Sequence, residues 1–174
     1  MANYPTIILI DSPKTKASAT FAECLKKNML HSEKNARIFS FPSDGIIGHQ
    51  LRVVEQGRYQ LDENSYHAFL LIDRMDLFFN PQYGIQKNGS SLEVVIIVGN
   101  FLSELQLSGA SSPITAWVES INAILPPPDI MVSIDCTSEQ ISHLQGIFPA
   151  ARHLPVQNAE TINPILEEIV SRLP

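Results

Sequence analysis

The stretch TIILIDSPKTKASATFAECL, residues 6–25, contains a strand, a turn and the start of a helix in direct succession. Residues 6–11 are an almost continuous apolar run, which is typical of a strand buried on both faces of a parallel sheet. Apolar residues then recur at helical spacing from Phe21 to Met29, which predicts a helix. The turn between them, residues 11–18, occupies the position of a phosphate-binding loop in an α/β protein, yet it contains no glycine.

Strands and helices alternate along the rest of the sequence. Further strands are predicted at residues 36–41, 93–98, 129–135 and 151–156, and helices at 44–56, 61–79, near 100–107, around Trp117, after 137 and at the end of the chain. Asp62 or Asn64 is expected to cap the helix of residues 61–79, and Asn80-Pro81 to end it. This alternation predicts one domain, residues 1–174, with a doubly wound, five-stranded parallel sheet flanked by helices.

The composition narrows the function classes. Hydrophobic residues make up 44% of the chain and charged residues 17%, which is a globular composition. The net charge is −6 and no basic stripe is visible, so we expect no direct nucleic-acid binding. The chain has no apolar run long enough for a membrane span and no signal-peptide pattern, so we expect an intracellular protein of the cytoplasm or nucleus that is not secreted and not membrane-bound.

No residue cluster indicates a metal or a cofactor. Cys24 and Cys136 lie far apart, which favours buried free thiols in a reducing compartment over a disulfide or a metal site. The five histidines are spread one to each element without metal-ligand spacing, and no serine lies in a GxSxG turn. We therefore predict no cofactor and no bound metal.

Four further segments resemble one family when they are taken in order. They are FPSDGIIG (41–48), LDENSYHAFLLIDRMDLF (61–78), EVVIIVGNFLSELQLSGA (93–110) and LPPPDIMVSID (125–135). Together with the first strand, turn and helix, they are similar to the thymidylate kinases, which are P-loop nucleoside monophosphate kinases. The resemblance covers roughly residues 5–136 and implies the P-loop kinase fold. The family's arginine-bearing lid should follow the fourth strand, and the chain there looks shortened, so we expect a lid that is reduced or absent.

The resemblance also places the family's phosphate loop on residues 12–20, in an altered form. On an ungapped register its two glycines fall on Ser12 and Ala17, its lysine on Ser18, and its hydroxyl pair on Ala19 and Thr20. A phosphate loop depends on glycine backbone geometry, on successive N–H groups and on a lysine beside the β and γ oxygens. These substitutions predict a loop that no longer binds nucleotide.

Two other catalytic positions of the family are altered as well. The acidic and basic residues expected at the end of the third strand correspond to Val98 and Gly99, which supply neither charge nor a side-chain oxygen. The arginine of the family's FP-x-R segment is replaced near Asp44, where a carboxylate would repel a phosphate. Arg74 and Leu70 lie where the family has base-contacting residues. They are either the remnant of a monophosphate pocket or ordinary packing residues, with Arg74 paired to an acidic neighbour.

Two functions remain open from the sequence. The first is a catalytically inactive thymidylate-kinase-like protein that acts as a protein-binding or structural subunit of an intracellular complex. The alternative is an atypical nucleotide-binding protein, or a nucleoside monophosphate kinase that uses other residues. The family forms homodimers through helices that correspond to 44–56 and 61–79, so the resemblance implies a homodimer or heterodimer through these helices. The predicted interface residues are apolar or aromatic: Tyr66, Phe69, Leu70, Met75, Phe78 and Phe79.

Overall fold

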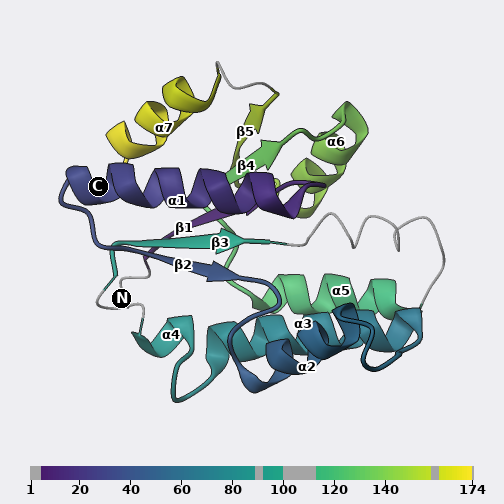
Figure 1. Cartoon of the computed structure of the whole chain (residues 1–174). Coiled ribbons are helices and arrows are strands. Elements are labelled where there is room, and N and C mark those ends of the chain that lie inside the picture. The colour runs from purple at the N-terminus through teal and green to yellow at the C-terminus, as the bar shows by residue number, and fades with distance from the viewer. Residues whose placement is uncertain (1–4, 89–91, 100–112, 158–160, 174) are drawn as a thin grey trace.

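The structure is a computed structural model that describes residues 5–88, 92–99, 113–157 and 161–173 (Figure 1). The expected helix near 100–107 lies outside these residues. The elements are β1 (Thr6–Asp11), α1 (Thr15–His31), β2 (Ala36–Ser40), α2 (Ile46–Glu55), α3 (Glu63–Phe79), α4 (Ile85–Asn88), β3 (Val94–Val98), α5 (Pro113–Ile124), β4 (Ile130–Ile134), α6 (Ser138–Ile147), β5 (Arg152–Val156) and α7 (Ile162–Ser171).

The five strands form one parallel sheet in the order β2-β3-β1-β4-β5, which confirms the predicted fold class. β1 is the central strand, and Ile8 is paired with Ile96 of β3 on one side and with Ile130 of β4 on the other. A strand in this position is buried on both faces, which explains the continuous apolar run of residues 6–11. β2 and β5 form the two edges of the sheet.

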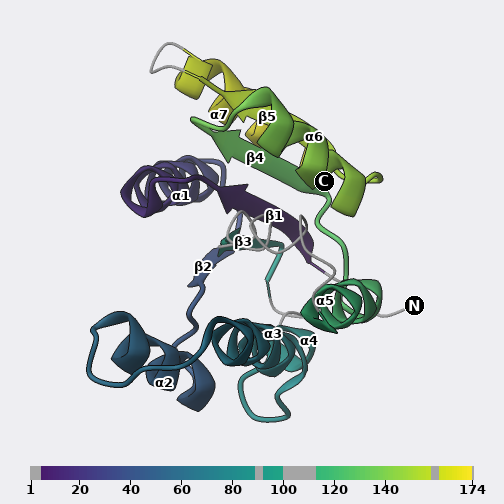
Figure 2. The same cartoon turned by 90° about the vertical axis from the view of Figure 1, so that its right-hand side faces the viewer.

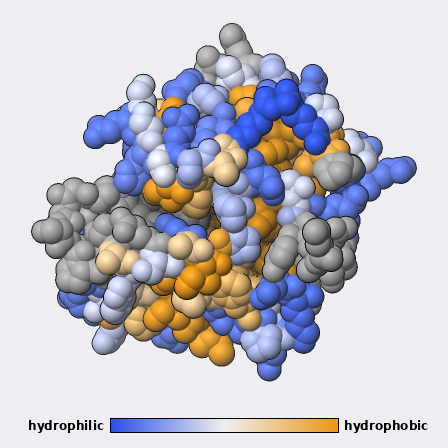
Figure 3. All heavy atoms as spheres, turned by 180° about the vertical axis from the view of Figure 1, so that it is seen from behind, coloured by the Kyte–Doolittle hydropathy of each residue, from blue (hydrophilic) through white to orange (hydrophobic). Residues whose placement is uncertain are grey.

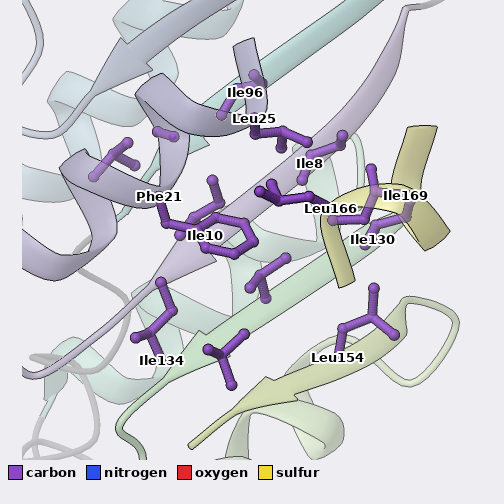
Figure 4. Close-up of a cluster of buried hydrophobic side chains, with 14 of the residues drawn as sticks. Ile8, Ile10, Phe21, Leu25, Ile96, Ile130, Ile134, Leu154, Leu166 and Ile169 are labelled. Atoms are coloured by element: carbon purple, nitrogen blue, oxygen red, sulfur yellow. The ribbon is translucent and has the colours of Figure 1, made fainter. Parts of the chain in front are cut away.

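Helices cover both faces of the sheet (Figures 1 and 2). α1 and α7 lie on one face, where Phe21 and Leu25 of α1 and Leu166 and Ile169 of α7 meet the strands (Figure 4). The layer of α2, α3, α4 and α5 lies on the other face, and α6 covers that same face beside β4. Its core includes Leu77 of α3 and other buried apolar residues: Ile7, Leu9, Phe41, Phe78, Val95, Ile97, Leu125, Leu144 and Phe148. The apolar residues of the three central strands, β3, β1 and β4, therefore divide between two cores.

Local signals set several helix boundaries. The Asp62 carboxylate accepts a hydrogen bond from the Ser65 N–H at 3.1 Å, so Asp62 is the cap of α3, one of the two residues expected. Thr137 and Gln140 form a capping box at the start of α6. Only residues 135–137 separate β4 from α6, so this connection has no room for a lid loop. No helix of the described chain is long and apolar enough to cross a membrane.

Candidate functional site

The strand order places a crevice at the carboxyl ends of β1 and β3. The chain leaves β1 toward β2 on one side and leaves β3 toward β4 on the other, so the two neighbouring strands form a topological switch point. Ligands of open α/β sheets bind in the crevice at such a point. The residues at this edge are therefore the first candidates for a functional site, and they include the turn that follows β1.

The turn after β1 is held by its own side chains. The Ser12 N–H donates to the Asp11 carboxylate at 2.8 Å, and the Lys14 N–H donates to the Ser12 hydroxyl at 3.0 Å. Pro13, between them, has no N–H to offer. A phosphate-binding loop works by directing successive N–H groups at an anion. In this turn the carboxylate and the hydroxyl already take two of those groups.

The next residues begin α1. The Ala17 N–H donates to the Lys14 carbonyl at 2.9 Å, and the buried Ser18 N–H lies 3.5 Å from the same oxygen. Ala19 and Thr20 are exposed, and the Thr20 hydroxyl donates to the Lys16 carbonyl at 2.9 Å, within the helix. The Thr20 hydroxyl is thus engaged with its own helix.

Lys14 contacts the end of a different strand. Its Nζ lies 3.0 Å from the Asp135 carboxylate, which follows β4 and whose residue has a left-handed backbone with φ of 54°. Beside this pair is a groove with a cavity volume of about 470 Å³, which lies within the range of small-ligand pockets. Its wall is mostly apolar and comes from α1, β4, β5 and α7, including Ala17, Phe21, Cys24, Ile134, Val156 and Ile162.

The end of β3 and the segment after β2 hold the other three predicted positions. Val98 is buried in the core beneath α1, and the Gly99 N–H donates to the Ile10 carbonyl at 2.9 Å. The Asp44 side chain is exposed and lies 3.6 Å from the Arg52 guanidinium. None of these three residues presents a cation to the crevice.

Arg74 and Leu70 are both buried inside the helical layer. Each is 1% exposed, and the Arg74 guanidinium carbon lies 5.6 Å from the centre of the Phe41 ring. Of the neighbouring carboxylates on α3, Asp73 accepts from Ser43, and Asp76 accepts from Tyr83 and Asn80. The cation lies against an aromatic ring. In this arrangement neither Arg74 nor Leu70 is accessible to a ligand.

Asp73 and Ser43 form a buried cluster that the sequence analysis did not single out. The Asp73 carboxylate, 0% exposed, accepts from the Ser43 N–H at 2.7 Å and from the Ser43 hydroxyl at 2.6 Å. Burial raises the pKa of Asp73, although these two bonds act in the opposite direction. Gly48 packs so closely against Ser43 that a Cβ atom would lie 2.1 Å from the Ser43 carbonyl oxygen. Arg52 donates to the Ser43 carbonyl at 2.6 Å, so the junction of β2 and α2 is fixed from three sides.

The six predicted interface residues separate into two groups. Leu70 and Phe78 point inward and are at most 4% exposed, so they are not part of any surface. Tyr66, Phe69, Met75 and Phe79 are partly exposed, and the Tyr66 hydroxyl donates to Glu55 of α2 at 2.9 Å. The sequence pattern could not separate these groups, because apolar residues on all sides of α3 conceal which side packs on the sheet.

Two other titratable residues, His67 and Cys136, have pKa values that burial shifts. Burial lowers the pKa of His67, a change that Glu63 opposes and Arg74 reinforces. Burial and the nearby Asp11 and Asp135 raise the pKa of the Cys136 thiol to about 11. Both cysteines are free thiols, and no group of three metal-ligating side chains occurs among the residues that the structure describes.

Comparison with known proteins supports the fold alone. No family model matches the sequence, and no curated protein does. The structure is similar to the crystal structure of thymidylate kinase from Ehrlichia chaffeensis, with a TM-score of 0.73 and 14% identity over 97% of this chain and 99% of the other. The protein thus has a P-loop kinase-like α/β fold. The particular fold is that of a thymidylate kinase.

Proposed function

We propose that this protein is a catalytically inactive member of the thymidylate-kinase-like fold that binds another protein chain through the outer face of its helical layer. The observation that carries the proposal is an apolar stripe along the solvent side of α3. The altered turn after β1 supports the first half of the proposal, and the exposed apolar residues of α2, α3 and α5 support the second.

Among the described residues, those at the crevice offer few of the groups that phosphoryl transfer requires, which supports the proposal of inactivity. Transfer depends on positioning and on neutralising charge with cations and N–H groups around the phosphates. Here the Ser12 and Lys14 N–H groups are bonded within the turn, and the Lys14 ammonium is paired with Asp135. Val98 and Gly99 add no charged group at the end of β3. Each such group typically lowers a barrier by about 2–4 kcal/mol, so several missing together leave no useful rate.

The stripe on α3 repeats with the spacing of a helix–helix contact. Ala68, Ile72, Met75 and Phe79 are separated by four, three and four residues, and Phe79 also packs partly against the core. All four are at least partly exposed, and Ile72 retains 48% of its accessible surface. Alternating spacings of three and four are those by which helices pack along a seam. The stripe therefore fits an apolar helix from another chain.

Exposed hydrophobic residues are concentrated in the same layer. Of the six large hydrophobic side chains that are exposed in the described chain, four belong to α2, α3 and α5: Ile46, Ile72, Trp117 and Ile124. Figure 3, a view from behind, shows hydrophobic atoms gathered on the lower part of the molecule, where Figure 1 places this layer. Large apolar patches on soluble proteins commonly mark association sites. The partner is a second copy of this chain or a different protein with an apolar helical surface.

The decisive experiment compares two exposed aliphatic residues on opposite layers. Ile72→Glu places a charge on the proposed interface, and Leu30→Glu places the same charge on α1, where Leu30 is 75% exposed. We expect Ile72→Glu to abolish association in sedimentation and pull-down assays, because a desolvated carboxylate costs several kcal/mol. Leu30→Glu should leave association through the helical layer unchanged, because Leu30 lies on the opposite face of the sheet. The proposed interface would be refuted if the wild-type protein is monomeric and Ile72→Glu does not change which proteins it captures.

Loss of activity is tested separately. Purified protein with ATP, Mg²⁺ and thymidine or uridine monophosphate should show no phosphoryl transfer above background. A control for contamination is the Lys14→Ala variant, since a genuine but atypical enzyme would depend on this cation of the turn. Turnover that disappears in Lys14→Ala would refute inactivity.

One observation favours a second candidate function, which is nucleotide binding without the family's loop. The groove beside Lys14 also exposes Lys16 and Thr20, which could meet an anionic ligand. A nucleotide present at a hundred times its dissociation constant would add about 2.7 kcal/mol of stability, a visible rise in melting temperature. We expect no rise with ATP or thymidine monophosphate. A rise that Lys16→Glu removes would establish this second function instead.

A further inference from the structure

We propose that the free edge of β2 is a docking site for an extended, acidic peptide segment of another protein, which adds to the sheet as a sixth strand. This site is separate from the helical layer of the proposed function and does not depend on it. The proposal rests on the open backbone groups of β2, on two hollows that flank them, and on the charge of their rim.

The backbone groups of alternate β2 residues point away from the sheet. The Phe41 N–H donates to the Val98 carbonyl and the Asn35 carbonyl accepts from the Val94 N–H, so the odd-numbered residues face β3. Ile38 and Ser40 therefore direct both their N–H and C=O groups to the outer side. No described residue pairs with these groups. Figures 1 and 2 show β2 at the edge of the sheet, with no element beyond it.

The opposite edge of the sheet is blocked. In β5 the Arg152 N–H and the Val156 carbonyl bond to the side of β4, so His153 and Pro155 face outward. Proline has no N–H, and a proline on an edge strand is a common means of preventing a further strand from pairing. β2 has no proline within residues 36–40. The β5 edge therefore resists pairing with a further strand, whereas β2 has no proline that would prevent it.

Two hollows lie along β2, one on each face of the sheet. On the α3 side, a cavity of about 260 Å³ is lined by Arg37, Phe39, Leu77 and Tyr83, among others. On the α1 side, a cavity of about 370 Å³ begins at Ala36 and includes Lys26, Leu30, Glu33 and Lys34. Successive side chains of a strand point to opposite faces. A strand added to β2 would therefore direct alternate side chains into the two hollows.

The charge at this edge indicates an acidic occupant. Lys26, Lys34 and Arg37 line the hollows although the whole chain has a net charge of −6. Among the described residues no carboxylate is paired with Arg37, whose guanidinium lies 4.8 Å from the centre of the Phe39 ring. The nearby carboxylates are Glu33, Asp44 and Glu93; Asp44 is paired with Arg52, and Glu93 lies 3.8 Å from Lys34. Lys26 and Arg37 are therefore the cations on which the preference for an acidic occupant rests. A second copy of β2 would bring these cations against themselves, which disfavours self-pairing.

These contacts define a short recognition pattern. An acidic side chain opposite Arg37 and an apolar side chain in the hollow of Leu77 and Tyr83 must lie on one face of the added strand, two residues apart. A parallel strand would present the acidic residue first, and an antiparallel strand would present it second. The intervening residue lies beside Ile38 on the α1 side of the sheet, so it is expected to be apolar.

The test uses two fluorescent heptapeptides with the full-length protein. Their sequences are Thr-Val-Glu-Val-Leu-Val-Thr and its reverse, one for each strand direction. We expect saturable binding of one peptide by fluorescence polarisation, together with slower hydrogen exchange of the Ile38 and Ser40 amides. If neither peptide binds below about 1 mM, the weak end of specific association, the proposal is refuted.

Variants of the edge sharpen the test. Ser40→Pro removes an outward N–H at an exposed position and should weaken binding about tenfold or more, whereas Ser40→Ala keeps the N–H and should bind like wild type. Arg37→Glu should weaken binding of the acidic peptide and strengthen binding of a peptide with lysine in place of glutamate. Arg58→Glu, at an exposed position away from this edge, should change the affinity for neither peptide. Equal binding by Ser40→Pro and Ser40→Ala would refute strand addition. A wild-type dimer that Ser40→Pro converts to a monomer would identify a second copy as the occupant and overturn the proposal. Ile72→Glu should leave peptide binding intact, so the proposed interface on the helical layer and the proposed site at β2 can be tested independently.

Discussion

Replacing Asp73 by alanine should be among the most damaging single changes at the sheet's carboxyl edge. The carboxylate is 0% exposed and accepts both the N–H and the hydroxyl of Ser43, at 2.7 and 2.6 Å. Alanine would leave two buried donors without an acceptor, and each such group costs about 1–3 kcal/mol. We expect a loss of about 3 kcal/mol, which corresponds to a fall in Tm of about 6–12 °C for a domain of this size. Urea and thermal unfolding measure both quantities.

Asp73→Asn is the matched control. An amide of the same shape can accept from the Ser43 N–H and donate to the Ser43 hydroxyl, so we expect it to change stability by less than about 1 kcal/mol at neutral pH. If Asp73→Asn is as damaging as Asp73→Ala, or if the alanine variant loses less than about 1 kcal/mol, the hydrogen bonds do not hold this junction.

The same pair of proteins tests the charge of Asp73. Burial raises its pKa above the ordinary value of 3.8, so between these two pKa values the folded state keeps a proton that the unfolded state releases. The stability that Asp73 contributes is therefore complete below pH 3.8 and falls as the pH rises through the raised pKa. Asp73→Asn lacks this dependence and should gain stability relative to wild type as the pH rises. A constant difference across that range would contradict the raised pKa.

The remaining predictions concern single side chains. The lowered pKa of His67 makes the neutral ring the native form, so stability is complete above pH 6.5 and is lost on acidification by up to about 1.4 kcal/mol per pH unit. His67→Leu should flatten this part of the unfolding profile. Gly48→Ala should destabilise the protein, because its Cβ would meet the Ser43 backbone, whereas Gly146→Ala meets nothing within 4 Å and should stabilise α6 by about 0.5–1 kcal/mol in the same thermal assay. Cys136, buried and with its pKa raised to about 11, should resist iodoacetamide at pH 8 until the protein is unfolded, as mass spectrometry would show.

Apolar periodicity was sufficient to predict the framework of the fold. The five strands occur within a residue of the predicted ranges and pair in parallel, because a strand buried on both faces leaves a continuous apolar run in the sequence. The cap at Asp62 and the stop before Asn80 follow from local chemistry that acts over three or four residues. The missing glycines of the turn after β1 are likewise visible in the sequence alone.

Only the tertiary structure decided which side chains the fold leaves accessible. Leu70 and Phe78 look like the other apolar residues of α3, but they point into the core, whereas Ile72 of the same helix faces solvent. Asp73 and Ser43 are thirty positions apart in the sequence, and their bond forms because α3 packs against the junction of β2 and α2. Where apolar residues occur on several sides of a helix, as in α3, their spacing does not show which side is buried. The packing of the neighbouring elements determines which side is covered.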